Sequence, residues 1–227
     1  MTDKEKKAFL SKIVQVDFPE DQYYKLQTPK KQIVIHHTAS GVGPDGDLRH
    51  WIGTKARIAT HIIIGRDGTM YQCFSSKYWA HHLGVKSVIF KQHGFNDYGI
   101  RNKILNQESI AIELDNWGGL KQDKDGNWLT WTGKVIDKKK VQEYPEGFRG
   151  HLGYEKYPKK QLDAMARLIR FWHDRYGIPM KYDKDMWDVS KKALSGKPGI
   201  YTHVSYRPDK SDCHPQPELI ETLKSLS

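Results

Sequence analysis

The stretch KQIVIHH, residues 31–37, places three β-branched apolar residues directly before two histidines. Such a run is typical of a strand that is buried on both faces of a sheet. Side chains alternate along a strand, so His36 and His37 are expected to point to opposite faces. The stretch therefore predicts a central strand with a polar side chain on each face at its carboxyl end.

Further elements are expected on both sides of this strand in the sequence. Thr60–Phe74 contains two β-rich runs around Asp67-Gly68, a dipeptide that suits a tight hairpin turn. Residues 109–114, SIAIEL, alternate and predict another strand. In Lys159–Tyr176 the apolar residues recur at helical spacing, and Gly177 is expected to end the helix. Weaker patterns predict helices over 2–13, 45–52 and 218–226, and a short strand over 201–204.

Strands that alternate with helices predict an α/β fold, a mixed β-sheet flanked by helices, as one domain over residues 1–227. An insertion is expected at about 118–158, where the chain is rich in Gly, Lys and Trp and where Asp125-Gly126 resembles a hairpin tip. A connection of this length usually is functional or has structure of its own. Its Trp128, Trp131 and Phe148 either pack a small core of the insertion or wall a substrate groove and grip sugar rings.

Composition narrows the class of protein. The 37 Lys and Arg residues against 27 Asp and Glu give a net charge of +10, which favours anionic partners. At 37% hydrophobic residues the chain can build a core, and no run approaches the roughly 18 apolar residues of a membrane span. The first residues lack the pattern of a signal peptide, so synthesis in the cytoplasm is expected. Cys73 and Cys213 are too few for a disulfide framework, and each is expected to be a reduced, buried thiol.

Three residues could bind a metal ion. His36 directly follows the run Ile33-Val34-Ile35, His203 follows Tyr201-Thr202 in the short predicted strand, and Cys213 lies ten residues further along. Imidazole nitrogen and thiolate sulfur are ligands that Zn²⁺ prefers, and three protein ligands with one open position are the layout of a catalytic zinc site. The alternative from spacing alone is a pair of core histidines and a buried thiol.

Four segments together resemble a known family. VIHHTAS (34–40), ATHIIIGRDGTMYQ (59–72), NQESIAIELDN (106–116) and THVSYRPDKSDCHP (202–215) occur in this order. They are similar to segments of the type-2 N-acetylmuramoyl-L-alanine amidases, a family that includes phage lysozyme-type amidases and the peptidoglycan recognition proteins. The resemblance implies an α/β domain that hydrolyses the amide between N-acetylmuramic acid and L-Ala of peptidoglycan.

The resemblance also implies one Zn²⁺ ion held by His36, His203 and Cys213. In many members of the family the third ligand is Asp, and in others it is Cys. The family's general base falls on Glu113 of SIAIEL. Some branches use a tyrosine before the histidine of the hairpin strand, but this chain has Thr60 there, which moves the role of base to Glu113.

Further site residues follow from the same resemblance. The family often has a lysine two residues before the third ligand, where it stabilises the oxyanion. Counted from Cys213 that position is Ser211, and Lys210 is its neighbour, so either side chain is a candidate. His82 in WAHHLG corresponds to a segment that lines the substrate groove, although a structural histidine is an equal alternative. Thr60, His82 and Ser211 are therefore expected to contact substrate.

The function expected from the resemblance is a phage-type endolysin or bacterial autolysin, without a separate cell-wall-binding domain. Its partner would be peptidoglycan, glycan strand plus stem peptide, and it would act as a monomer at the bacterial cell wall. The alternative is a recognition module that binds peptidoglycan without cutting it. Such modules commonly lose a zinc ligand, whereas all three candidate positions here keep competent side chains. Nucleic-acid binding is not expected, because no nucleic-acid motif accompanies the basic charge.

Overall fold

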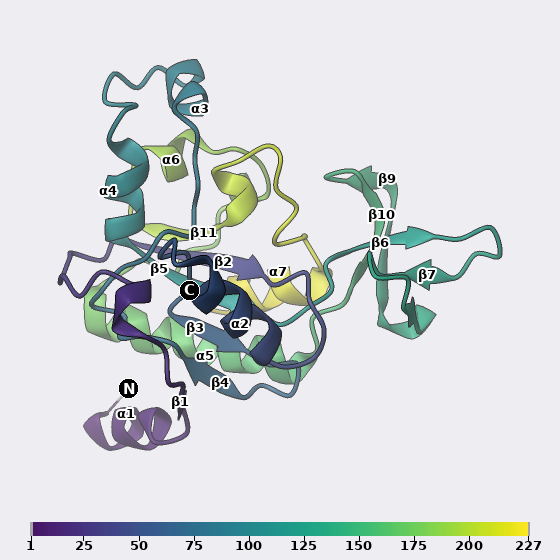
Figure 1. The fold of residues 1–227 in the computed structure, drawn as a ribbon, viewed down its shortest axis with the longest axis horizontal. Helices are drawn as coiled ribbons and strands as arrows, with labels where there is room; N and C mark the ends of the chain where they lie inside the picture. The colour runs from purple at the N-terminus through teal and green to yellow at the C-terminus, as the bar shows by residue number, and fades with distance from the viewer. Residues whose placement is uncertain (1, 227) are drawn as a thin grey trace.

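A computed structural model describes residues 2–226. Its centre is a six-stranded mixed sheet in the order β1-β4-β3-β5-β2-β11 (Figure 1). β3, β5, β2 and β11 are parallel neighbours, and β4 pairs antiparallel with β3. Parallel neighbours need long crossover connections, which the helices supply. The strands are β1 (Val14–Gln15), β2 (Gln32–His37), β3 (Ile62–Ile64), β4 (Met70–Gln72), β5 (Ser109–Leu114) and β11 (Gly199–Thr202).

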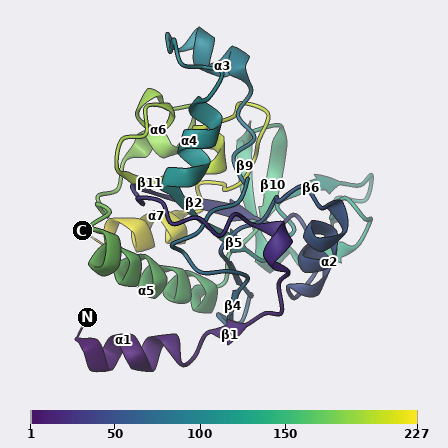
Figure 2. The same cartoon turned by 60° about the vertical axis from the view of Figure 1, so that its left-hand side comes forward.

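One face of this sheet is covered by two helices (Figure 2). α5 (Lys159–Tyr176) and α7 (Pro217–Lys224) pack on the odd-numbered residues of β2 and the even-numbered residues of β5, among them Ile35 and Ile112. The opposite face is covered by shorter helices, and Val34 of β2 lies in their core. The remaining helices are α1 (Asp3–Leu10), α2 (Asp45–Thr54), α3 (Ser87–Gln92), α4 (Arg101–Glu108) and α6 (Lys191–Leu194).

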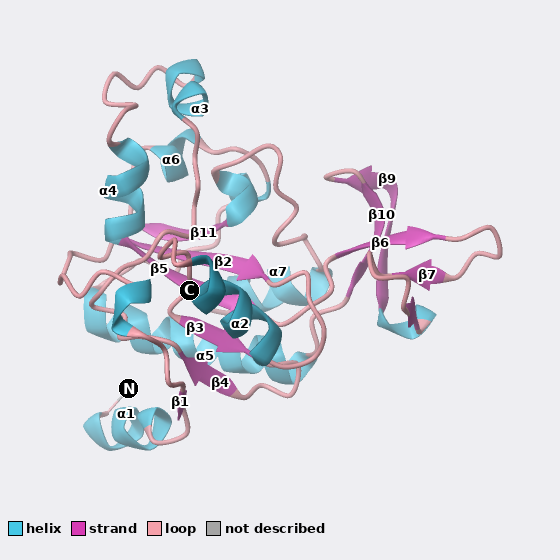
Figure 3. Ribbon diagram, in the orientation of Figure 1, coloured by secondary structure: helices cyan, strands magenta, loops and turns pink. Residues whose placement is uncertain are grey.

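The segment at 118–158 forms a second sheet of its own. This antiparallel sheet, in the order β8-β7-β6-β10-β9, lies to one side of the main body (Figure 3). Leu120, Trp128, Ile136 and Val141 form its small core. Its strands are β6 (Gly119–Gln122), β7 (Trp128–Leu129), β8 (Val135–Ile136), β9 (Val141–Phe148) and β10 (His151–Glu155).

The expected elements agree closely with these bounds. Lys159–Tyr176 and Ser109–Leu114 are helix and strand over the predicted residues. Asp67-Gly68 turns between β3 and β4, where Gly68 has a φ of +87° that a residue with a Cβ rarely adopts. The strand expected at 201–204 lies two residues earlier in the structure, at Gly199–Thr202. It ends there because the chain enters a short 3₁₀ helix at His203.

An ion pair network joins the two sheets. The Arg66 guanidinium contacts Asp115, just after β5, and donates to Glu155 of β10 at 2.7 Å. It also donates to the carbonyls of Ser40 and Gly41, at 3.3 and 3.2 Å. One attachment of the inserted sheet to the main body is therefore a largely buried cation, whose side chain is 14% exposed.

No helix among the described residues is long and apolar enough to cross a membrane. Both cysteines are free and buried, as expected for reduced thiols. Trp128 packs in the core of the second sheet, whereas Trp131 is 69% exposed. Trp128 therefore packs in the insertion's own small core, and Trp131 does not.

Candidate active site

The carboxyl ends of three adjacent parallel strands meet at one edge of the main sheet. His36 of β2 pairs with Glu113 of β5, and His203 follows β11 directly. In open α/β sheets, ligands bind in the crevice beyond this edge. Here the edge opens into a cleft of about 550 Å³. Its lining includes the polar residues His36, Thr60, His82, Glu113, His203, Lys210, Ser211 and Asp212.

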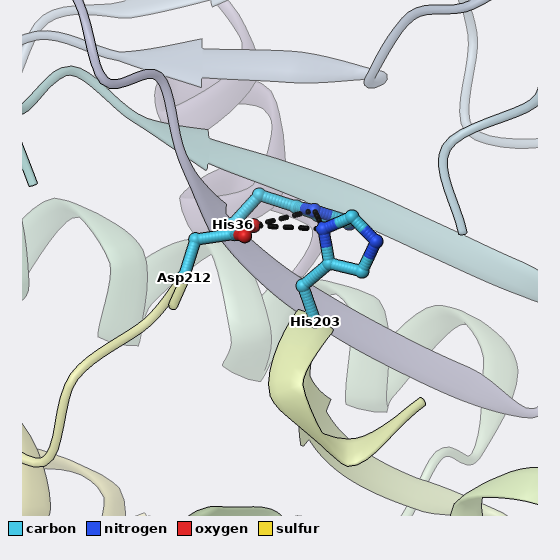
Figure 4. A group of neighbouring side chains, drawn as sticks. All are labelled: His36, His203 and Asp212. Atoms are coloured by element: carbon cyan, nitrogen blue, oxygen red, sulfur yellow. Dashed lines mark hydrogen bonds and ion pairs between the residues drawn. The ribbon is translucent and has the colours of Figure 1, made fainter. Parts of the chain in front are cut away.

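Three side chains converge in this cleft (Figure 4). Nδ1 of His36 lies 3.1 Å from Nδ1 of His203 and 3.1 Å from Oδ2 of Asp212. Nδ1 of His203 lies 2.9 Å from the same carboxylate oxygen. All three residues are buried, so water does not screen their interaction.

A chain of hydrogen bonds sets the tautomer of His36. The Ser109 hydroxyl donates to the carbonyl of Leu105 at 2.7 Å, so its oxygen accepts from Nε2 of His82 at 2.7 Å. Nδ1 of His82 then accepts from Nε2 of His36 at 3.1 Å. Burial and the nearby His203 lower the pKa of His36 to about 4, so the ring is neutral at pH 7. Its Nδ1 therefore presents a lone pair to the centre of the group.

The tautomer of His203 follows from one contact. Its Nε2 lies 2.9 Å from the carbonyl of Leu83, which can only accept a hydrogen bond. Nε2 therefore carries a proton, and Nδ1 is directed at Asp212 and His36. The Nδ1 atoms of two imidazoles and a carboxylate oxygen thus face one another, and all three can bind one cation placed between them.

The donor set fits Zn²⁺. Two imidazole nitrogens and one carboxylate oxygen are zinc ligands, and three protein ligands leave a fourth position open. Bonds of about 2.0–2.1 Å in tetrahedral geometry separate neighbouring donors by about 3.3 Å. The separations of 2.9–3.1 Å found here are close to that spacing. Asp212 supplies the carboxylate oxygen of this donor set.

The expected third ligand, Cys213, needs correction, because the group contains Asp212 in its place. The Cys213 side chain is completely buried in the core beneath the sheet, beside the hydroxyl of Tyr157. Burial raises the pKa of its thiol well above the usual value, which disfavours the thiolate. Adjacent side chains point in different directions here, so Asp212 faces the cleft and Cys213 does not.

This correction also changes the position of the lysine. Lys210, rather than Ser211, lies two residues before Asp212, and both line the cleft. The family spacing of a lysine two residues before the third ligand is thus met with Asp212. The sequence carried this signal, since DKSDC contains two adjacent candidate ligands and only one of them has the lysine at the family's spacing.

Glu113 is 7% exposed and lines the same cleft. Burial raises its pKa well above the usual value, and the charges of Asp212 and Asp47 act in the same direction. Lys210 and the hydroxyl of Thr60 oppose this shift without cancelling it. A carboxylate with a raised pKa is a stronger base than an exposed glutamate, which suits the role of proton acceptor.

The remaining expected residues lie around this centre. Thr60 is buried beside Glu113, and Ser211 is half-buried next to the hydroxyl of Tyr154. His82 lines the cleft and also contacts His36, a link that sequence reasoning missed. Asn106 accepts from the backbone N–H groups of His82 and Leu83, at 2.7 and 3.1 Å, and so holds this segment in place.

Comparison with known structures supports the fold. PlyL aligns at 14% sequence identity with a TM-score of 0.51, covering 95% of this chain and 98% of that one. A selenomethionine derivative of AmpD aligns at 15% identity and 0.50, covering 95% and 94%. The Staphylococcus aureus hydrolase AmiA, solved in complex with its ligand, aligns at 13% and 0.50, covering 95% and 82%. No curated protein sequence matches the chain.

The family follows from the sequence profile. The profile described as N-acetylmuramoyl-L-alanine amidase matches residues 26–217, which include the second sheet, every strand of the main sheet except β1, and every residue of the cleft described above. The enzyme class expected from the four segments is confirmed, as is the α/β fold. This chain belongs to the N-acetylmuramoyl-L-alanine amidase family.

Proposed function

We propose that this amidase is zinc-dependent and that His36, His203 and Asp212 bind the ion. The observation that carries the proposal is the convergence of the Nδ1 atoms of two imidazoles on one carboxylate oxygen, with separations of 2.9–3.1 Å. Glu113 lines the same cleft and supplies the base. We further propose that residues 1–227 act as one catalytic unit that includes the insertion.

The residues divide the chemistry of amide hydrolysis among them. Zn²⁺ held by this group supplies a Lewis acid for the scissile carbonyl and lowers the pKa of water to about 7. Glu113 accepts the proton of the attacking water and returns it to the departing amine. The ammonium group of Lys210 stabilises the negative charge that develops on the carbonyl oxygen. Thr60, Ser211 and His82 border the bound substrate.

The proposed biological role is lytic, as a phage-type endolysin or a bacterial autolysin. The net charge of +10 favours association with the carboxylates and phosphates of a bacterial wall. The alternative, a module that binds peptidoglycan without cutting it, has no use for a buried base with a raised pKa. The combination of Glu113 with the metal-binding group favours the enzyme.

Assay of purified peptidoglycan with and without a chelator tests this proposal. We expect release of new L-Ala amino ends, loss of release after chelation, and recovery with Zn²⁺. Equal activity after complete metal removal would contradict zinc dependence. Binding without new amino ends would support the recognition module, and new reducing sugar ends would indicate a glycosidase instead.

A further inference from the structure

The loop that carries Asp212 is held from behind by aromatic residues. His214, two residues after Asp212, is completely buried. Its ring stacks between Tyr154 of β10 and Tyr157, with ring centroids 4.5 and 4.6 Å away and interplanar angles of 24° and 23°. The inserted sheet therefore supplies one of the two surfaces between which this loop is fixed.

Hydrogen bonds fix the same ring in its own plane. Nε2 of His214 donates to the carbonyl of Glu155 at 3.1 Å, because a carbonyl can only accept. Nδ1 then accepts from the hydroxyl of Tyr144 in β9 at 2.8 Å. Both ring nitrogens are thus bound by residues of the insertion.

The backbone on either side is attached as well. The N–H of His214 donates to the hydroxyl of Tyr157 at 3.3 Å, and Gln216 exchanges two hydrogen bonds with the backbone of Tyr157 at 2.6 and 3.1 Å. The same Tyr157 hydroxyl lies 2.8 Å from Nδ1 of His37, the residue after His36. One tyrosine thus contacts the neighbours of two candidate ligands.

We propose that Tyr144, Tyr154 and Tyr157, here called the aromatic clamp, position Asp212 for metal binding through His214. This inference rests on the proposed zinc site. Metal donors must be held within about 0.5 Å of their productive positions. Groups that hydrogen-bond to a ligand itself typically contribute 10–100-fold to metal affinity, and for the clamp, which acts two residues away from Asp212, we expect the low end of that range. The insertion is then a structural part of the metal site, although none of its residues is a ligand.

The most specific test is Tyr144→Phe. This variant keeps the aromatic ring of residue 144 and removes only the hydroxyl group that donates a hydrogen bond to Nδ1 of His214. We expect the zinc dissociation constant, measured by competition with a chelating dye, to rise about tenfold. In the metal-free protein we expect faster hydrogen exchange at the amides of Val204 and His214. The first of these donates to the Asp212 carbonyl at 3.1 Å and the second to Tyr157.

Tyr98→Phe is the matched control, because it removes a tyrosine hydroxyl outside the clamp. Tyr98 is 39% exposed and lies between α3 and α4, where the Lys91 ammonium group lies over its ring. Unchanged exchange in Tyr144→Phe would overturn the clamp whether or not the protein binds zinc. If Tyr144→Phe exchanges faster but binds zinc as tightly as wild type, the proposal is also overturned, because the clamp then has a structural role only. Wild-type protein that binds no zinc would instead contradict the proposed function.

A second, independent observation concerns Trp131. Its indole N–H donates to the carbonyl of Ala39 at 2.7 Å, and Ala39 lines the cleft. The turn that carries it is rigid, because Thr130 receives hydrogen bonds from the backbone of Gly133 and Lys134 at 2.9 and 3.0 Å. With its polar atom satisfied, this 69% exposed side chain offers only a flat apolar ring beside the cleft.

We infer that Trp131 stacks against a pyranose ring of the glycan strand beyond the N-acetylmuramic acid whose amide is cut, an inference that also rests on the proposed function. The apolar face of a sugar ring presents C–H groups that pack on the electron-rich face of an indole. A stem peptide offers no comparable rigid flat surface, and the carboxylates that it carries gain nothing from an apolar ring. The fixed orientation of the ring lowers the entropic cost of binding.

Comparison of two substrates tests this inference. For Trp131→Ala we expect KM on polymeric peptidoglycan to rise several-fold, with no change on a muropeptide that carries a single N-acetylmuramic acid. Cosedimentation of zinc-free protein with insoluble peptidoglycan should weaken in parallel, which needs no turnover. Leu152→Ala, at another exposed apolar position of the insertion (54% exposed), is the control.

The outcomes separate the alternatives. Equal loss on both substrates would indicate a contact with the peptide or a structural effect, and unchanged cosedimentation would remove the glycan contact; either overturns the inference. Wild-type protein that releases no amino ends from either substrate would contradict the proposed function, while the cosedimentation result would still apply to Trp131.

Discussion

The two sheets of this amidase are held together in different ways. The main sheet is mostly parallel, and Ile33, Ile35, Ile110 and Ile112 of its central strands are fully buried. The inserted sheet is antiparallel, with a core of only four buried apolar residues. A small antiparallel sheet gains little stability from so few apolar contacts. It depends instead on polar and aromatic contacts to the main body, through Arg66 and His214.

The two sheets also differ in the roles of their residues: the main sheet carries the candidate catalytic groups, and the inserted sheet supports them. Every candidate for metal binding or proton transfer belongs to the main sheet or to the loop after β11. The insertion contributes contacts behind that loop and one exposed tryptophan beside the cleft. Variants on each side should therefore behave differently.

The largest effect is expected at the metal-binding group. Asp212→Ala should lose stoichiometric zinc and all measurable amidase activity, because it removes one of three donors. Cys213→Ala should keep both, at a cost of about 1 kcal/mol from lost core packing. Metal content measured by atomic absorption distinguishes the two. Retention of zinc by Asp212→Ala and loss by Cys213→Ala would restore the cysteine as ligand.

The next effect is expected at the base. Glu113→Gln preserves the shape of the side chain and removes its ability to accept a proton, so kcat should fall by roughly 10²–10⁴-fold. Zinc content should equal that of wild type. A kcat within tenfold of wild type would exclude Glu113 as the base.

A smaller effect, on stability, is expected at the ion pairs of Arg66 that connect the two sheets. Arg66→Met leaves Asp115 and Glu155 buried without their cation, which should lower the free energy of unfolding by about 3–5 kcal/mol. Urea unfolding measures this loss directly. Lys159→Met is the control, because it breaks an exposed i,i+4 pair with Asp163, and such pairs contribute about 0.3–0.5 kcal/mol.

The smallest effect is a dependence of stability on pH. Burial raises the pKa of Glu113 well above 4.5 in the folded protein. The folded state therefore binds more protons than the unfolded state between those two values, and Glu113 lowers stability as pH rises through that window. Metal-free Glu113→Gln should melt at a higher temperature than wild type at neutral pH, with the difference vanishing below pH 4. A difference that is independent of pH would contradict this assignment.

Local pattern predicted most of the main body. The β-branched run before His36 and the alternation around Glu113 are signals within a few residues, and both strands form where expected. The strands of the insertion were not predicted individually, because short antiparallel strands with exposed faces carry little periodicity. Trp128 and Trp131 looked equivalent in sequence, and only their positions in the second sheet distinguish them.

By itself the sequence determined the family, the fold class, and the presence of His36, His203 and Glu113 at the ends of strands. Those features are carried by residue type and local order. Only the tertiary structure separated Asp212 from Cys213, because the direction in which two adjacent loop side chains point depends on what packs behind them. It also joined His82 to His36 and the clamp to His214, since those contacts link segments 46 and 70 residues apart.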